Sequence, residues 1–414
     1  MLKMLLNIDN KPAPVHPFAL FQLGFRPFFL GAALYSVIAI LLWTVAYSFQ
    51  WSPETILQLG NSFWWHGHEM VFGYATAVAA GFLLTATMNW TGVQTIRFTP
   101  LAILFSLWLL ARLLPWISAI PMFIPAVLDL LFLLALTVAV THPLYKARQW
   151  DQVRIFTSKL STLFLCNLIF YLGIFGIIDG GERIGLYGGV YMILALILTL
   201  GRRVFPFFIE KGVEAQTRSE GSGRPLTLKN SKFLDISSLV LFLLFALSDL
   251  FLSQLWVSGA LAATLVVVHG IRFRNWYTPM IWDKPLLWVL MVGYGWIIIG
   301  LLFKALAAIG MVPQHIALHA FTYGAIGIIT IGMMARVSLG HSGRDILHPP
   351  RILHLIFGLL LAGAVIRVII PLLIPQQFAT LVLVSQLLWI ASFSLFLRDY
   401  ALMLIRPRKD GRPG

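Results

Sequence analysis

The sequence predicts an all-α, polytopic integral membrane protein with about twelve transmembrane helices, and its composition and hydropathy carry that prediction. Of the 414 residues, 59% are hydrophobic and only 11% are charged, whereas roughly a quarter of the residues of an ordinary soluble domain are charged. The mean hydropathy is +0.86, and the apolar runs are long and continuous rather than alternating as in an outer-membrane barrel. This composition excludes a cytosolic enzyme, a disordered chain and a nucleic-acid-binding domain, so we expect a lipid bilayer and no nucleic acid as partners.

Successive apolar runs predict where each helix begins and ends. About 20 apolar residues are needed to cross the hydrocarbon core of a bilayer. We expect membrane-spanning helices over 27–48, 67–89, 98–115, 121–141, 157–178, 184–206, 233–252, 254–272, 285–307, 314–338, 351–371 and 378–402. The third and fourth are divided only by the segment from Pro115 to Pro121, and the seventh and eighth only by Ser253 and Gln254.

The positions of the basic residues orient these helices. Lys and Arg collect in the N-terminal segment, in every second loop after it and in the C-terminal tail, while 49–66 and 372–377 contain none. Positively charged loops stay on the cytoplasmic side of a membrane. We therefore expect a multi-pass protein of the cell inner (plasma) membrane with both termini cytoplasmic, and the same rule accounts for the net charge of +14. Four exceptions stand near predicted helix ends, from which their side chains can snorkel to the interface: Arg112, Arg183, Lys304 and Arg367.

A polar stretch divides the predicted helices into two groups of six. Residues 207–232 are rich in charged and small residues, and we expect them to form a cytoplasmic loop. The loop separates an N-terminal membrane half, 1–206, from a C-terminal membrane half, 233–414, which ends in a short basic tail. No segment is long enough for a separate soluble domain, so we expect the function within the bilayer or at its surfaces.

Histidines and a carboxylate gather where the second helix begins. His66 and His68 flank Gly67, and Glu69 follows directly. Imidazole and carboxylate groups are ligands for copper, zinc and haem iron. The competing interpretation is a polar cap on a tightly packed helix interface. On a helix, His66 and His68 point about 200° apart, so both can face one ion only if the chain at Gly67 is not helical; otherwise one of them serves a second centre.

The tenth helix begins with a second pair of histidines. His315 and His319 are spaced to share one helix face. The segments 68–73 and 319–324 also share a histidine, an aromatic residue and a glycine at matched offsets, a short internal similarity. If the two helices pack together, we expect His66, His68, Glu69, His315 and His319 to act as one unit of metal or haem ligation.

A second candidate set lies at the predicted cytoplasmic ends. Arg202 and Arg203 end the sixth helix, and Arg336 ends the tenth. Guanidinium groups bind carboxylates in a two-point manner, so these arginines are candidates for holding haem propionates, although the charge rule for loops alone would place arginines there. His269 and His341 are candidates for ligating a second centre on this side.

Four motifs together resemble the NnrS family of haem- and copper-containing membrane proteins. They are FALFQLGFRPFF at 18–29, WHGHEMVFGY at 65–74, GRRVFPFF at 201–208 and HAFTYGAIGIITIGMMARVSLGHSGR at 319–344. The resemblance implies a twelve-helix inner-membrane protein that holds haem and copper. It also implies a role in nitric oxide metabolism and resistance to nitrosative stress, with nitric oxide as the small-molecule ligand. It implies neither a settled reaction nor a set of ligands, so enzymatic activity stays open.

Two other classes of protein share parts of this pattern. Twelve helices in two groups of six are a common layout of secondary transporters, but Asp129 and Asp249 are the only acidic residues well inside the predicted spans. A membrane haem enzyme that reduces nitric oxide is also a helical bundle. That class calls for an adjacent His-His pair, which this sequence lacks.

Overall fold

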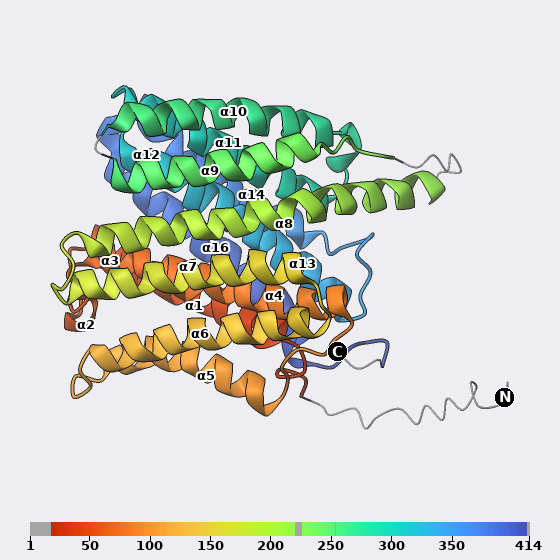
Figure 1. Ribbon diagram of the computed structural model, residues 1–414, viewed down its shortest axis with the longest axis horizontal. Coiled ribbons are helices and arrows are strands. Elements are labelled where there is room, and N and C mark those ends of the chain that lie inside the picture. Colours follow the sequence, from red (N-terminus) through yellow and green to blue (C-terminus); the bar gives the residue numbers. More distant parts are fainter. Residues whose placement is uncertain (1–17, 220–225, 253, 412–414) are drawn as a thin grey trace.

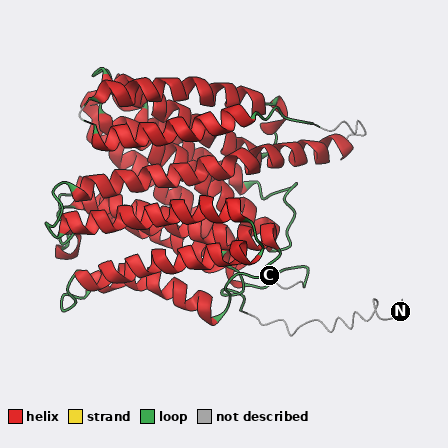
Figure 2. Cartoon of the chain, in the orientation of Figure 1, coloured by secondary structure: helices red, strands yellow, loops and turns green. Residues whose placement is uncertain are grey.

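Twelve helices are long and apolar enough to cross a membrane in the part of the chain that the structure describes, which confirms the predicted fold class. The structure is a computed structural model that describes residues 18–219, 226–252 and 254–411. The helices lie side by side in one bundle (Figures 1 and 2), with no strand among those residues. This is a multi-pass membrane protein.

The twelve spans follow the predicted order closely. They are α1 (Phe25–Ser48), α3 (Ser62–His68) with α4 (Thr76–Thr91), α5 (Thr99–Leu113), α6 (Phe123–Lys146), α7 (Trp150–Ile174), α8 (Gly181–Ser219), α9 (Lys232–Phe251), α10 (Leu255–Trp276), α11 (Pro285–Ala308), α12 (Gln314–His319) with α13 (Ile328–His341), α14 (Ile352–Val368) with α15 (Ile370–Leu373), and α16 (Phe378–Ile405). A further short helix, α2 (Glu54–Leu57), lies in the link between α1 and α3.

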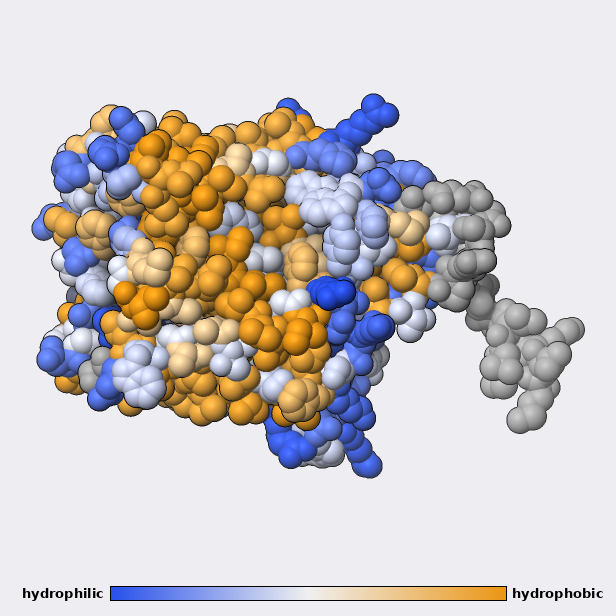
Figure 3. All heavy atoms as spheres, turned by 90° about the horizontal axis from the view of Figure 1, so that it is seen from above, coloured by the Kyte–Doolittle hydropathy of each residue, from blue (hydrophilic) through white to orange (hydrophobic). Residues whose placement is uncertain are grey.

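The outer surface of the bundle is apolar in its middle. Figure 3 shows a broad hydrophobic band across the face in view, with hydrophilic residues gathered toward the two ends. Leu134 on α6 and Val267 on α10 leave 50% and 61% of their surface exposed. Large contiguous apolar surfaces on a protein are covered by a partner or by lipid, and a band around a helical bundle matches the hydrocarbon core of a bilayer.

The two chain ends described by the structure meet at one end of the bundle. The Ala19 amide donates a hydrogen bond to the Ile405 carbonyl over 2.7 Å. The buried guanidinium of Arg26 donates to the carbonyls of Leu404 (3.0 Å) and Arg406 (2.7 Å). An even number of spans requires this arrangement. We call this end, which also holds the C-terminal end of α8 and the turn between α10 and α11, the basic end.

Helix α8 is longer than predicted. The apolar run predicts that this helix ends at 206 and that a loop follows at 207–232, but the helix continues through Pro206 to Ser219. An ion pair one turn apart, Lys211 to Glu214 at 2.8 Å, supports the polar extension. The Glu210 carboxylate accepts a hydrogen bond from the Leu228 amide over 2.8 Å, which ties the returning chain to this helix. A polar sequence with such contacts can therefore form a helix beyond the membrane.

The second and tenth spans carry the same irregularity. A π-helical segment, Glu69–Ala75, separates α3 from α4, and another, Ala320–Gly327, separates α12 from α13. Each follows directly on a histidine of the internal similarity, His68 or His319. These spans are also the most deeply buried of the twelve: 78% and 83% of the residues in their most apolar 18-residue stretches are buried. Because π-helical segments are rare and frequently mark functional sites, the centre of the bundle is where a site is expected.

Candidate metal centre

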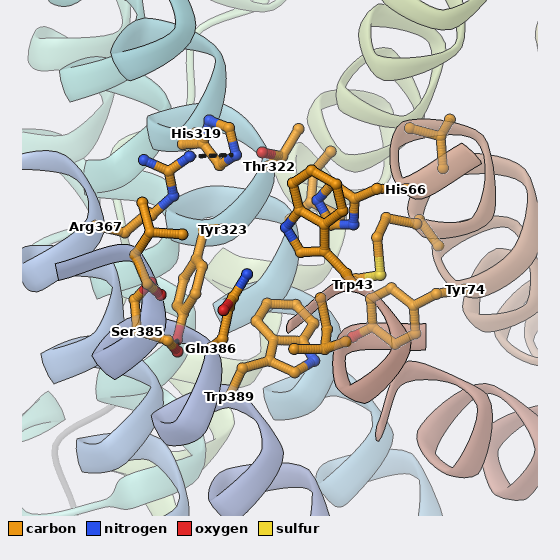
Figure 4. A pocket seen from close by; sticks show the side chains of 16 residues that line it. Trp43, His66, Tyr74, His319, Thr322, Tyr323, Arg367, Ser385, Gln386 and Trp389 are labelled. Atoms are coloured by element: carbon orange, nitrogen blue, oxygen red, sulfur yellow. Dashed lines mark hydrogen bonds between the residues drawn. The ribbon is translucent and has the colours of Figure 1, made fainter. Parts of the chain in front are cut away.

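A cavity lies between the two central spans, at the end of the bundle opposite the basic end. His66 from α3 and His319 from α12 both line it, and Arg367 reaches it from α14 (Figure 4). Figure 4 shows His319 beside Arg367 on one side, and His66 with Trp43 on the other. The remaining wall residues are Ile40, Trp43, Met70, Val71, Tyr74, Ala75, Thr322, Tyr323, Ile326, Val382, Ser385, Gln386 and Trp389. The cavity volume is about 70 Å³, which is room for an ion with a few water-sized ligands.

The His66 ring is held in one orientation. Helix α3 starts at a cap in which the Asn61 side chain accepts hydrogen bonds from the Phe63 and Trp64 amides, both over 2.9 Å. One turn later, the His66 ring stacks on Trp43 with centroids 4.5 Å apart and planes 7° apart. Its Nδ1 is buried and has no hydrogen-bond partner among the described residues.

His319 has a defined tautomer. Its Nδ1 donates to the His315 carbonyl over 2.7 Å, because a carbonyl oxygen can only accept. Its Nε2 is therefore the acceptor for Arg367 Nη2, at 3.2 Å. The Nε2 lone pair faces the side of the cavity where Arg367 lies. A metal ion bound there would take this lone pair from the hydrogen bond, and a carboxylate would take the Arg367 donor.

Unpaired buried polar atoms converge on the cavity. Besides His66 Nδ1, they belong to Arg367 (Nη1), Gln386 (Nε2 and Oε1) and Trp389 (Nε1). Buried polar groups in folded proteins are nearly always hydrogen-bonded, and each exception calls for an explanation. Four such residues around one cavity indicate a binding site.

His68 belongs to a different, fully paired network. Its Nδ1 lies 2.9 Å from Glu69 Oε1 and its Nε2 lies 3.0 Å from Asn167 Oδ1. The Asn167 amide nitrogen donates to Asp129 over 2.7 Å, which fixes which atom it turns to His68. Both His68 nitrogens are therefore engaged by oxygen atoms of Glu69 and Asn167, and neither is free for a metal.

Glu69 also turns away from the cavity. Its Oε2 accepts a hydrogen bond from the Tyr35 hydroxyl over 2.6 Å and lies 3.5 Å from Arg112 Nε. Gly73 makes room for this contact, since a Cβ there would lie 2.9 Å from both the Glu69 carboxylate and the Tyr35 ring.

The five residues proposed as one ligand unit are thus divided by the structure. His66 and His319 share the cavity, whereas His68 and Glu69 lie in the neighbouring ionic network. His315 is exposed, with its ring 5.3 Å from that of Phe378. No three His, Cys, Asp or Glu side chains within the described ranges gather closely enough to hold a metal ion. The physical reason is the regular helix through Gly67, which directs His66 and His68 to opposite sides.

The prediction that isolated basic residues snorkel is wrong for Arg112 and Lys304. Arg112 is buried and contacts Asp129 at 2.5 Å. Lys304 is also buried, with its Nζ 2.8 Å and 3.0 Å from the two carboxylate oxygens of Asp249. Each pair joins two helices, and its two residues lie at the same depth in the membrane. Opposite charges at the same predicted depth on two spans are therefore the sequence signal that could have predicted these ion pairs. Arg367, also assigned to snorkelling, lines the cavity instead.

The candidate residues at the basic end do not form one site. Arg202 and Arg203 line a cavity with Trp90, whereas Arg336 lines a different one with Arg344. Seventeen residues separate Arg336 from His319, roughly 25 Å along a helix, so Arg336 cannot contact a group bound at the His66–His319 cavity.

His269 and His341 also have separate surroundings. His269 is buried, and its Nδ1 lies 2.6 Å from the Tyr294 hydroxyl. The His341 ring packs against Phe25, and its Nε2 lies 3.4 Å from the Asn89 amide nitrogen.

A second cavity of about 70 Å³ adjoins the first. Ala75 lines both, and the 2.7 Å hydrogen bond between the Tyr74 and Thr330 hydroxyls stands between them. Apart from Thr330 and Gly201, the described part of its wall consists of Ala, Val, Ile, Leu, Phe and Met side chains from α4, α8, α13 and the π-helical segment Glu69–Ala75. It therefore suits an apolar molecule.

Comparison with known proteins identifies the family. The family model described as NnrS protein matches residues 19–408, nearly the whole chain. No curated protein sequence matches the chain. The four motifs, the twelve spans and this match agree, and the chain belongs to the NnrS family, membrane proteins of the nitric oxide response.

Proposed function

We propose that this chain is a haem- and copper-binding inner-membrane protein that acts in nitric oxide metabolism and in resistance to nitrosative stress. We place its metal centre at His66 and His319. The observation that carries this proposal is the convergence of two imidazoles and several unpaired buried polar atoms on one cavity between the two central spans.

The donor atoms of the cavity suit both cofactors. Imidazole ligates copper and haem iron, and the Met70 thioether adds a soft ligand that copper accepts. Arg367 offers a guanidinium for a haem carboxylate. The cavity volume of about 70 Å³ accommodates an ion as it stands, whereas a haem requires the aromatic wall residues to move apart. When bound, either metal would supply a redox-active centre that binds nitric oxide.

The chain's own residues would position and shield that centre. Trp43 orients the His66 ring by stacking, and the His315 carbonyl orients the His319 ring. The aromatic rings of Tyr74 and Trp389 form part of the wall that would surround the centre. Nitric oxide is small and uncharged, so the adjoining apolar cavity offers it a route that ions cannot take.

The transporter alternative loses support from the buried carboxylates. A cation-coupled transporter uses intramembrane acidic groups to carry its coupling ion. Asp129 is already paired with Arg112, and Asp249 with Lys304. This pairing weighs against a cation-coupled transporter.

The proposal is tested by metal content and visible spectra. Full-length protein expressed with ample haem and copper should show a haem Soret band that shifts when nitric oxide is added, and metal analysis should find copper. The changes His66→Ala and His319→Ala should each lower the content of haem, copper or both by severalfold. His142→Ala, at an exposed position on α6, is the matched control and should leave both unchanged.

Two results would refute the proposed site. One is a folded His66→Ala/His319→Ala double variant with the metal content of the wild type. The other is a wild-type preparation with neither a Soret band nor bound copper.

A further inference from the structure

A cavity of about 360 Å³ opens at the basic end of the bundle. Three segments far apart in the sequence meet there: the polar extension of α8, the start of α11, and α13 with the loop that follows it. Four of its wall residues are basic, namely Lys211, Lys284, Arg336 and Arg344. The volume falls in the range of ordinary small-molecule sites, roughly 300–1,000 Å³.

Arg336 is built into the wall rather than placed in a loop. It lies on α13 within the bundle, and its guanidinium lies 3.7 Å from the centroid of the Phe208 ring. Stacking uses the flat face of the guanidinium and leaves its N–H groups directed sideways. No carboxylate pairs with Arg336 among the described residues, so these donors are available to an anion.

Arg344 is held by a braced turn. The turn contains Gly343 in the left-handed conformation, with φ of +70°, which glycine adopts without strain. The C-terminal tail supports it, since the Lys409 amide donates to the Ser342 carbonyl over 3.1 Å. Arg344 Nη1 is buried and has no hydrogen-bond partner in the described part of the chain, a state that a bound anion would relieve.

Positive charge is in excess in this cavity. Lys211 is paired with Glu214, but Lys284 is paired with no acidic side chain in the described structure. Asp345 is the single acidic residue among the described residues of its wall. The hydrogen bond from His348 holds the pKa of the Asp345 carboxyl below its usual range, so this group stays ionised. The charge rule for cytoplasmic loops explains why basic residues lie at this end, but not the stacked Arg336 or the unpaired Arg344.

We propose that this cavity binds a phosphate-bearing anion. Arg336 and Arg344 would donate to the phosphate oxygens, and Lys284 would add positive charge. The apolar wall of Leu286, Leu287 and Ile346 lies beside these groups. Both the headgroup of an anionic phospholipid and a soluble phosphate compound present this chemistry. The proposal is independent of the metal centre at the opposite end of the bundle.

Thermal unfolding of the full chain tests the proposal. Delipidated protein in a neutral detergent is titrated with phosphatidylglycerol or, as a control, phosphatidylcholine. In a second arm it is titrated with inorganic phosphate or with chloride at equal ionic strength. A ligand that binds only the folded state raises the midpoint in a saturable manner. Arg336→Gln and Arg344→Gln should each weaken the apparent affinity about tenfold, the worth of one charged hydrogen bond.

Arg154→Gln is the matched control, because Arg154 is exposed and its one ion pair within the described residues is with nearby Asp151 at the start of α7. It should leave the affinity unchanged. Stabilisation by phosphatidylglycerol alone identifies a lipid headgroup, and stabilisation by inorganic phosphate identifies a soluble ligand. If an arginine variant does not fold, the affinity of Lys284→Gln replaces it in the comparison. Broadening of the ³¹P NMR line of the ligand by the wild-type protein then provides a second measurement of binding. The proposal is overturned if neither phosphate source has a saturable effect. It is also overturned if the folded arginine variants keep the affinity of the wild type.

Discussion

Arg112 and Asp129 show how single residues decide whether a charge is tolerated inside the membrane. Arg112 stands near the end of α5 and Asp129 near the start of α6, and their side chains are almost fully buried. A buried charge that loses its partner keeps the full penalty of its desolvation. The same reasoning applies to Lys304 and Asp249, which join α11 to α9.

We expect Arg112→Met to lower the free energy of unfolding by about 3–5 kcal/mol, because it leaves Asp129 buried without its main counter-charge. The double variant Arg112→Met/Asp129→Leu removes both charges and should recover much of that loss. Chemical unfolding in detergent, followed by tryptophan fluorescence, measures both. The control is Arg154→Met in the exposed pair with Asp151, where a change of at most about 1 kcal/mol is expected. Equal destabilisation by the single and double variants would contradict the prediction.

The central helices depend on close approach between elements. The π-helical segment Ala320–Gly327 packs against α11, and Gly324 lies where a Cβ would come within 2.6 Å of the Trp296 ring. By contrast, a Cβ at Gly270 on α10 would meet no atom within 4 Å. The two glycines therefore have opposite roles, although both lie inside helices.

Gly324→Ala should destabilise the protein by about 1–3 kcal/mol, because the added methyl group must displace a packed indole. It should also lower the metal content of the proposed centre, since the neighbouring Tyr323 lines the cavity. Gly270→Ala should be neutral or stabilising by up to about 1 kcal/mol, the difference in helix propensity between the two residues. Thermal midpoints and metal content of the two variants check this. A Gly324→Ala variant as stable as wild type would show that α11 can shift without cost.

At the scale of the whole molecule, the even number of spans places both described chain ends together. Which side of the membrane they face depends on the uneven distribution of Lys and Arg between the two ends of the bundle.

Reporter fusions test that orientation. Fusions after residue 55, in the link between α1 and α3, should report the external side. Fusions in 226–231 and after residue 414 should report the cytoplasm. The physical reason is that the basic loops resist translocation. If the fusions after 55 and within 226–231 reported the same side of the membrane, both the orientation and the number of spans between them would be wrong.

Sequence by itself determined the class of the protein, its twelve spans, the even count and the two spans that carry the candidate histidines. Hydropathy and charge are sums along one helix, so they do not depend on neighbouring helices. Tertiary structure decided which side chains meet. It separated His66 from His68, drew Arg367 into the cavity with His319, and paired Arg112 with Asp129. It also placed Arg336 and Arg202 in different cavities. These contacts depend on the rotation and depth of each helix against the others, which only the packing of the whole bundle sets.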